Sequence, residues 1–308
     1  MMAAALRVFP TFEQLSVSVA DAVAATLNST IAAQGRCSLV LSGGRTPQEL
    51  YRVLAANHRT TIQWSVVDVF WGDERLVPVG DGRRNDRMAR EMLLNHVPCP
   101  ESHIHPMAAH AMPGESAARE YEQTMRRYFG NGRPRFDLVL LGLGAEGHTA
   151  SMFPDSPALN ERERWVCAVT VPAEPPDRLT LTLPVFSQAA NIFFLVSGAD
   201  KSRALRHALD ERTDPRTSPA AAVKPIDGTL TWWVDADAAE SEIMTTKNTR
   251  DNDMQKGAVE GTEHDPIVPV NSIGAVFEDS EVSNADETGH TTDAPRDEEE
   301  TLGERNGR

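Results

Sequence analysis

The sequence predicts an α/β fold: a doubly wound, mostly parallel sheet with helices on both faces, forming a single domain with a disordered C-terminal tail. Three observations support this prediction. Short apolar runs alternate with helix-like stretches over residues 1–240, which is typical of strands joined by crossover helices. Glycine and polar residues follow several of the apolar runs. After Ser241 the composition changes to mainly polar and acidic residues.

Helices are predicted where apolar residues recur at helical spacing. In the first helix the recurring residues are Leu15, Val19 and Val23. The second has Pro47 in its first turn, where the missing N–H costs no hydrogen bond, and Pro98 closes the third. The five predicted helices are 12–33, 47–56, 86–96, 116–128 and 201–209.

Strands are predicted from short apolar runs bounded by turn residues. The run at 136–141 is the best candidate for a central strand, because five of its six residues are apolar. The other predicted strands are 38–41, 66–71, 165–171, 179–183, 191–196 and 229–234, and a short ending follows at 235–239.

The net charge of −15 arises mainly from the C-terminal part of the chain. From Ser241 to the end there are 17 acidic and 6 basic residues, whereas residues 1–240 have a net charge of −4. Low hydrophobicity with high net charge does not offset the entropy lost on folding. We therefore predict an α/β domain at 1–242 and an acidic, disordered tail at 243–308, for which the sequence indicates no partner.

Composition also excludes several classes of protein. The domain lacks the positive excess of a non-specific nucleic-acid-binding protein. Its longest nearly apolar run, 138–145, is far shorter than the ~20 residues that span a bilayer, and the N-terminus lacks the features of a signal peptide. The chain has an odd number of cysteines at wide spacing (Cys37, Cys99 and Cys167), which fits neither a disulfide framework nor a cysteine-rich zinc site. These features predict a cytoplasmic protein with reduced thiols, bound to neither nucleic acid nor membrane.

Glycine and polar or charged residues follow four predicted strands. Ligands of open parallel sheets bind outside the carboxyl ends of the strands, so these four loops are expected to form one crevice. A single loop of this kind is ordinary turn chemistry, but four with the same arrangement favour a binding site. The loops are 42–47, 72–75, 142–149 and 197–201.

The loop at 42–47 suits an anion. Gly43 and Gly44 let backbone N–H groups approach a ligand, and Ser42 and Thr46 add hydroxyl donors. The helix that follows directs the positive end of its dipole at the same place. The loop lacks the Gly-Lys-Ser/Thr sequence of a P-loop, which argues against nucleotide triphosphates.

His148 is the best candidate for a general base, because a histidine changes charge near neutral pH and this one lies in a glycine-rich loop after a central strand. Glu146, two residues earlier, is suited to orient the ring. Residues 142–147 spell G-x-G-x-x-G, but Pro154 and Pro157 interrupt the next stretch, where a dinucleotide-binding motif would open a helix. A dinucleotide is therefore the less favoured interpretation.

Further charged residues adjoin these loops. Asp73 is a candidate for binding hydroxyl groups, and Arg75 for binding an anionic or carbonyl oxygen. Arg178 and Lys201 would complete a phosphate clamp with Ser42 and the rest of its loop. The alternative for Asp73 and Arg75 is a surface salt-bridge cluster, and the alternative for Arg178 and Lys201 is a solvated surface charge.

Together, these loops resemble the 6-phosphogluconolactonases, within the wider group that includes glucosamine-6-phosphate isomerases and deaminases. The resemblance covers nearly all of 1–240, and Gly-His-Thr-Ala-Ser-x-Phe-Pro at 147–154 is its most specific part. The matching stretches are LSGGRTP at 41–47, FWGDER at 70–75 with Asn85 downstream, LGLGAEGHTASMFP at 141–154, RLT at 178–180 and GADK at 198–201.

The resemblance implies hydrolysis of 6-phospho-D-glucono-1,5-lactone to 6-phosphogluconate, the second step of the oxidative pentose phosphate pathway, without a metal or organic cofactor. The partner would be the phosphorylated sugar lactone. His148 would activate water with support from Glu146, and Arg75 would stabilise the oxyanion. The family usually has Asp in place of Glu146, and Ser in place of Arg84.

Two alternatives stay open. One is a glucosamine-6-phosphate isomerase or deaminase, in which Asp73 would abstract the proton. That branch typically has Gly-His-Ile-Ala-Phe-Asn-Glu-Pro where this chain has residues 147–154, which favours the lactonase. The other is a sugar-phosphate-binding protein without catalytic activity, which only Glu146 and the acidic tail support.

Overall fold

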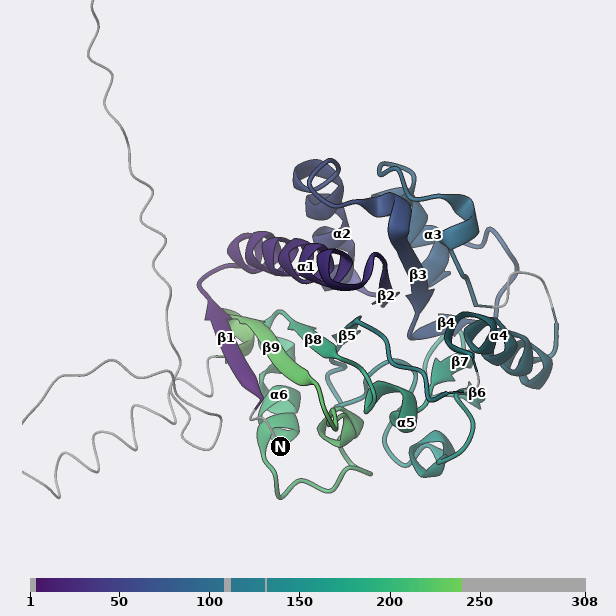
Figure 1. Ribbon diagram of the computed structural model, residues 1–308. Helices are drawn as coiled ribbons and strands as arrows, with labels where there is room; N and C mark the ends of the chain where they lie inside the picture. The colour runs from purple at the N-terminus through teal and green to yellow at the C-terminus, as the bar shows by residue number, and fades with distance from the viewer. Residues whose placement is uncertain (1–3, 108–111, 131, 240–308) are drawn as a thin grey trace, which may run out of the picture. The chain divides into compact units, whose positions relative to one another are not determined.

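The computed structural model describes residues 4–107, 112–130 and 132–239, which are coloured in Figure 1. The predicted tail at 243–308 and the domain boundary at 242 lie outside the described residues.

The core of the described chain is a parallel sheet of six strands in the order β1-β9-β8-β5-β2-β3. This confirms the predicted fold class. β5 lies between β8 and β2, as expected for the best candidate for a central strand, and all five residues of β2 are buried. The strands are β1 (Ala5–Phe9), β2 (Cys37–Leu41), β3 (Val67–Trp71), β5 (Leu138–Gly142), β8 (Asn191–Val196) and β9 (Thr229–Asp235).

A second, antiparallel sheet of three strands was not predicted. It has the order β4-β7-β6, with β4 at Asp73–Arg75, β7 at Asp177–Leu181 and β6 at Val166–Thr170. The prediction of 72–75 as a loop is therefore wrong, because residues 73–75 pair with β7 as a short strand. β1 was also missed.

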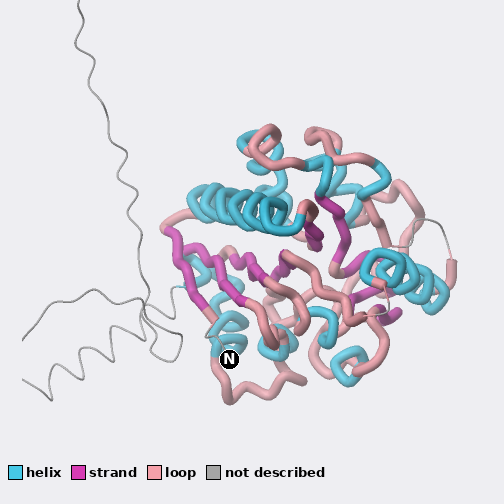
Figure 2. The backbone as a smooth tube through the Cα atoms, viewed as in Figure 1, coloured by secondary structure: helices cyan, strands magenta, loops and turns pink. Residues whose placement is uncertain are grey.

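Helices cover both faces of the central sheet. Figure 1 shows α1 and α2 on one side and α6 on the other, and Figure 2 shows the helices flanking the strands. Two predicted starts come two residues late, since α2 begins at Arg45 and α4 at Gly114. The third predicted helix consists of α3 followed by a π-helix at Arg90–Leu94. The α-helices are α1 (Phe12–Gln34), α2 (Arg45–Asn57), α3 (Asn85–Ala89), α4 (Gly114–Phe129), α5 (Leu183–Phe186) and α6 (Ser202–Leu209).

Helix α1 is long and apolar enough, by length and composition alone, to cross a membrane. The sequence did not predict this helix as a candidate membrane span, because polar residues interrupt its apolar residues. In this fold one face of α1, including Leu15, Val19, Val23 and Leu27, is buried in the core. The apolar residues whose helical spacing predicted α1 are therefore the ones that pack against the core.

The strand order determines where the loops meet. β2 has β5 on one side and β3 on the other, and β8 lies beside β5. Since all four strands are parallel, their carboxyl ends lie at one edge of the sheet, together with the loops that follow them.

Candidate active site

The four loops converge on one cavity of about 240 Å³. This confirms the predicted crevice. The predicted site residues line it, with the exception of Glu146, which lies beside His148 outside the lining. The lining residues are Ser42, Gly43, Gly44, Arg45, Thr46, Pro47, Asp73, Arg75, Asn85, Gly142, Leu143, Gly144, His148, Ala150, Arg178, Leu195, Ser197 and Lys201.

The loop after β2 presents backbone N–H groups and a hydroxyl to the crevice. The buried Tyr51 hydroxyl accepts a hydrogen bond from Ser42 N at 2.9 Å and donates one to Ser42 O at 2.8 Å, which fixes the end of the strand. The Oγ atom of Ser42 is buried without a partner among the described residues. Gly44 has a φ of 108° and precedes α2, whose first N–H groups have no partner within the helix. This geometry suits an anion.

Two guanidinium groups face each other across the small sheet. Arg75 on β4 is the register partner of Arg178 on β7, and both line the crevice. Like charges placed directly opposite each other on paired strands destabilise the pairing. Burial, and then the neighbouring Arg75, lower the pKa of Arg178, although nearby carboxylates oppose this. An anion between the two groups would relieve their repulsion.

Lys201 adds a third cation from the loop after β8. Gly198 begins this loop with a φ of 97°, and its N–H donates to Asp235 Oδ1 at 3.0 Å. Asp235 also accepts hydrogen bonds from the Ser197 hydroxyl and from Ala238 N, so the end of β9 anchors the loop. The Lys201 ammonium is 3.2 Å from Asp200 and partly exposed.

His148 packs closely against Phe153 and Gly144. The ring stacks on Phe153 with centroids 4.1 Å apart, and Gly144 lies so close that a Cβ there would be 2.0 Å from Nδ1. Nδ1 is buried 3.0 Å from Glu146 Oε1, but without the alignment of a hydrogen bond. The edge of the ring that carries Nε2 is therefore the one available to the crevice.

The carboxylate of Glu146 stays ionised beside the ring. Burial opposes its ionisation, but a hydrogen bond from its own backbone and the charge of His148 outweigh that effect and lower its pKa. Its side chain is 48% exposed. This position suits a group that stabilises the imidazolium without contacting the ligand.

Asp73 is buried and joins two loops. Its Oδ2 accepts a hydrogen bond from Ser151 Oγ at 2.6 Å, and Asn85 Nδ2 donates to its backbone oxygen at 2.9 Å. Asn85 lies against Gly43, where a Cβ would come within 2.0 Å of Oδ1. That Oδ1 atom has no partner among the described residues.

Asn85, Arg45 and Ser197 line the crevice, and sequence reasoning missed them as site residues. Asn85 was part of the matching motif, which was the available signal. Ser151 belongs to the block at 147–154, but nothing in the sequence indicates that it bonds to Asp73, 78 residues earlier.

Beneath the crevice Glu74 is fully buried, and its carboxylate accepts three backbone N–H groups. Burial, reinforced by Asp86, raises its pKa to about 7 despite these hydrogen bonds and Arg84.

A carboxyl whose pKa is higher in the folded state binds protons more tightly there, so ionisation destabilises the fold. We expect the free energy of unfolding to fall as pH rises from 5 through 7, and to fall less steeply in Glu74→Gln. Urea denaturation at pH 5, 6 and 7 measures both slopes. Equal slopes in the two proteins would contradict the assignment.

No described group of three or more His, Cys, Asp or Glu side chains could hold a metal ion. His105 Nε2 is 2.8 Å from Asp68 Oδ1, and its ring stacks on Phe70. Within the described chain all three cysteines are free thiols. A larger hollow of about 440 Å³ around Trp165 shares no lining residue with the crevice.

The fold and the crevice define an α/β protein with a cavity at the carboxyl ends of its parallel strands, lined by Arg75, Arg178 and Lys201. The chain belongs to the family of glucosamine-6-phosphate isomerases and 6-phosphogluconolactonases, whose model matches residues 10–232. This confirms the resemblance found in the sequence.

Relatives and solved structures agree with this assignment. The chain is 40% identical over 222 residues to a 6-phosphogluconolactonase of Synechocystis, covering 71% of this chain and 90% of that protein. It is 40% identical over 245 residues to one of Mycobacterium tuberculosis, covering 77% and 98%. The structure of the Trypanosoma brucei 6-phosphogluconolactonase matches with a TM-score of 0.69 at 27% identity, covering 78% of this chain and 99% of that one.

Proposed function

We propose that this protein hydrolyses 6-phospho-D-glucono-1,5-lactone to 6-phosphogluconate, the second step of the oxidative pentose phosphate pathway. The observation that carries the proposal is the crevice itself, where Arg75, Arg178 and Lys201 face the same cavity as His148. The relatives named 6-phosphogluconolactonase support this substrate. A cytoplasmic location is consistent with the free thiols.

The phosphate of the substrate is held by the cations and the loop after β2. Lys201 and Arg178 supply charge-assisted hydrogen bonds. The backbone N–H groups at the start of α2 add donors, together with the hydroxyls of Ser42 and Thr46. Asp73 and Asn85 line the same cavity, where sugar hydroxyls can hydrogen-bond to their oxygens.

Hydrolysis begins when His148 Nε2 accepts a proton from a water molecule as the water oxygen attacks the lactone carbonyl. Arg75 stabilises the negative charge that develops on the carbonyl oxygen. The tetrahedral intermediate collapses as the bond to the ring oxygen breaks, and that oxygen takes the proton from the imidazolium. Glu146 stabilises the imidazolium between the two transfers.

The direct test is to incubate the purified protein with freshly generated lactone and to follow acid release above the spontaneous rate. Release at the spontaneous rate would contradict the proposal. Ammonia release from glucosamine 6-phosphate would instead identify a deaminase, and binding of 6-phosphogluconate without turnover would identify a binding protein.

Arg178→Ala and Lys201→Ala are expected to raise KM, each by about 10- to 100-fold, with a smaller effect on kcat. A hydrogen bond to a charged group contributes about 1.5–3 kcal/mol, and about 1.4 kcal/mol corresponds to a factor of ten in affinity. Steady-state kinetics measure both constants. Lys224→Ala, at an exposed lysine outside the crevice, is the matched control. Unchanged KM in both variants would remove these residues from the phosphate site.

A further inference from the structure

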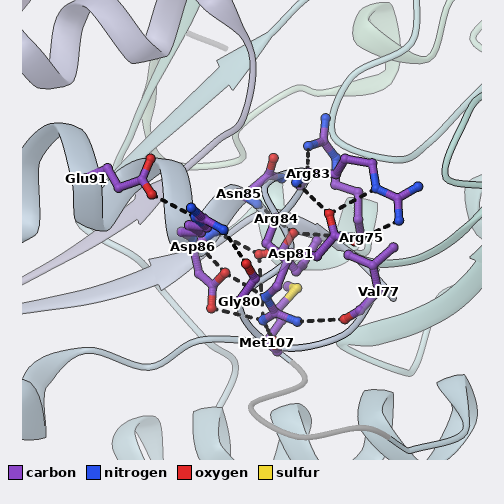
Figure 3. Close-up of polar contacts among 12 residues, drawn as sticks. Arg75, Val77, Gly80, Asp81, Arg83, Arg84, Asn85, Asp86, Glu91 and Met107 are labelled. Carbon is purple, nitrogen blue, oxygen red and sulfur yellow. Dashed lines mark hydrogen bonds and ion pairs between the residues drawn. The ribbon is translucent and has the colours of Figure 1, made fainter.

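A buried ionic cluster lies behind the crevice at the start of α3. It consists of Glu74, Arg84 and Asp86, and the Arg84 side chain is only 1% exposed. Figure 3 shows Arg84 among its partners, with Arg75 and Asn85 nearby. A buried guanidinium requires charge compensation and hydrogen bonds, and this cluster supplies both.

Glu74 ties together the backbone of two crevice residues. Its Oε1 accepts hydrogen bonds from Arg75 N and from Asn85 N, both at 2.7 Å, and its Oε2 accepts one from Asp86 N at 2.8 Å. One carboxylate therefore joins β4 to the first turn of α3. The positions of Arg75 and Asn85 relative to each other depend on it.

Arg84 also makes hydrogen bonds at the start of α3, where Glu74 joins it to β4. Its Nε and Nη2 donate to Asp86 Oδ1 and Oδ2 at 2.7 and 2.9 Å, and Nη2 also donates to the backbone oxygen of Met107 at 2.8 Å. Nη2 lies 3.9 Å from Glu74 Oε2. The guanidinium thus lies between two buried carboxylates and links them to the segment at Met107.

We propose that Arg84 is a positioning residue, which holds Arg75 and Asn85 in the crevice through its charge pairing with Glu74 and Asp86. The proposal rests on the function proposed above for the crevice. Arg84 itself is absent from the lining of the cavity, so it acts through the residues that it holds.

Electrostatics explain why an arginine is needed here. Removing the cation would leave Glu74 and Asp86 buried near each other without compensation, which destabilises a protein strongly. Burial already raises the pKa of Glu74. Loss of the cation favours its protonation further, and a protonated carboxyl is a weaker acceptor for the N–H groups of Arg75 and Asn85.

The test compares Arg84→Met with Arg84→Lys, which keeps the charge but loses the bidentate pairing. Small displacements of catalytic groups cost up to about 100-fold, so we expect kcat/KM to fall about 10- to 100-fold in Arg84→Met and less in Arg84→Lys. The matched control is Arg87→Met in α3, three residues after Arg84, because the Arg87 side chain is exposed and paired with Glu91. It should keep kcat/KM within about twofold of the wild type, as surface changes away from special features usually do.

A double-mutant cycle separates positioning from general structural damage. If Arg84 acts through Arg75 and Asn85, adding Arg84→Met to an Arg75→Ala/Asn85→Ala protein should lower kcat/KM by less than about twofold further. The full loss in that background would overturn the proposal, as would unchanged kcat/KM in Arg84→Met. If circular dichroism shows that Arg84→Met is unfolded, the same cycle with Arg84→Lys decides. Wild-type turnover in the same assay tests the proposed function separately.

Discussion

Replacing His148 with alanine is expected to lower kcat by about 10²- to 10⁴-fold, the usual contribution of a general base, and to leave substrate affinity nearly unchanged. The reason is that different elements carry the groups that bind the substrate and the histidine that activates water. The groups proposed to bind phosphate come from β7 and from the loops after β2 and β8, whereas the proposed base, His148, comes from the loop after β5. Steady-state kinetics with fresh lactone, corrected for spontaneous hydrolysis, provide the measurement.

The matched control is His207→Ala, because His207 is an exposed histidine on α6 and does not line the crevice. It should behave like the wild type. Undiminished kcat in His148→Ala would refute the assignment of the base. A large rise in KM with unchanged kcat would assign His148 to binding instead.

Gly144→Ala is expected to lower kcat nearly as much as loss of the histidine, by about 100-fold or more, since displacement of a reacting group by an ångström can cost that factor. A methyl group at Gly144 would lie 2.0 Å from His148 Nδ1 and 2.3 Å from Cε1. Phe153 stacks on the ring, so the imidazole cannot tilt freely to make room. The ring would have to leave its present position beside Glu146.

Gly82→Ala is the matched control for this substitution. Like Gly144, Gly82 has no positive φ, and no described atom lies within 4 Å of a Cβ placed there. Kinetics and thermal unfolding of both variants separate displacement of the ring from loss of the fold. Normal kcat in a folded Gly144→Ala protein would mean that the position of the ring is unimportant.

The central sheet could be predicted because its inner strands are buried on both faces. β2, β5 and β8 are short apolar runs that need no partner to be identified. β1 could not be identified in this way, because it is an edge strand whose first three residues are not buried. β4 consists of Asp73, Glu74 and Arg75, and its strand conformation depends on pairing with β7, about a hundred residues later.

The candidate site, like the fold, could be predicted only in part. Gly43, His148 and Lys201 follow predicted strands directly, so the topology of a parallel sheet brings them together. The supporting contacts could not be predicted, because they join residues that are distant in the sequence. Ser151 bonds to Asp73 across 78 residues, and Arg84 to the carbonyl of Met107 across 23.

The convergence of the loops on one crevice also links ligand binding to cooperative folding. The lining extends from Ser42 to Lys201, so most of the domain must be in place before the binding site exists. A ligand that binds only the native state raises the free energy of unfolding by RT ln(1 + [L]/Kd). Bound 6-phosphogluconate should therefore slow hydrogen exchange in the slowest-exchanging amides of β5 as well as in the loops. A proteolytic fragment lacking either end of this span should not retain a fraction of the affinity; it should lose the affinity altogether.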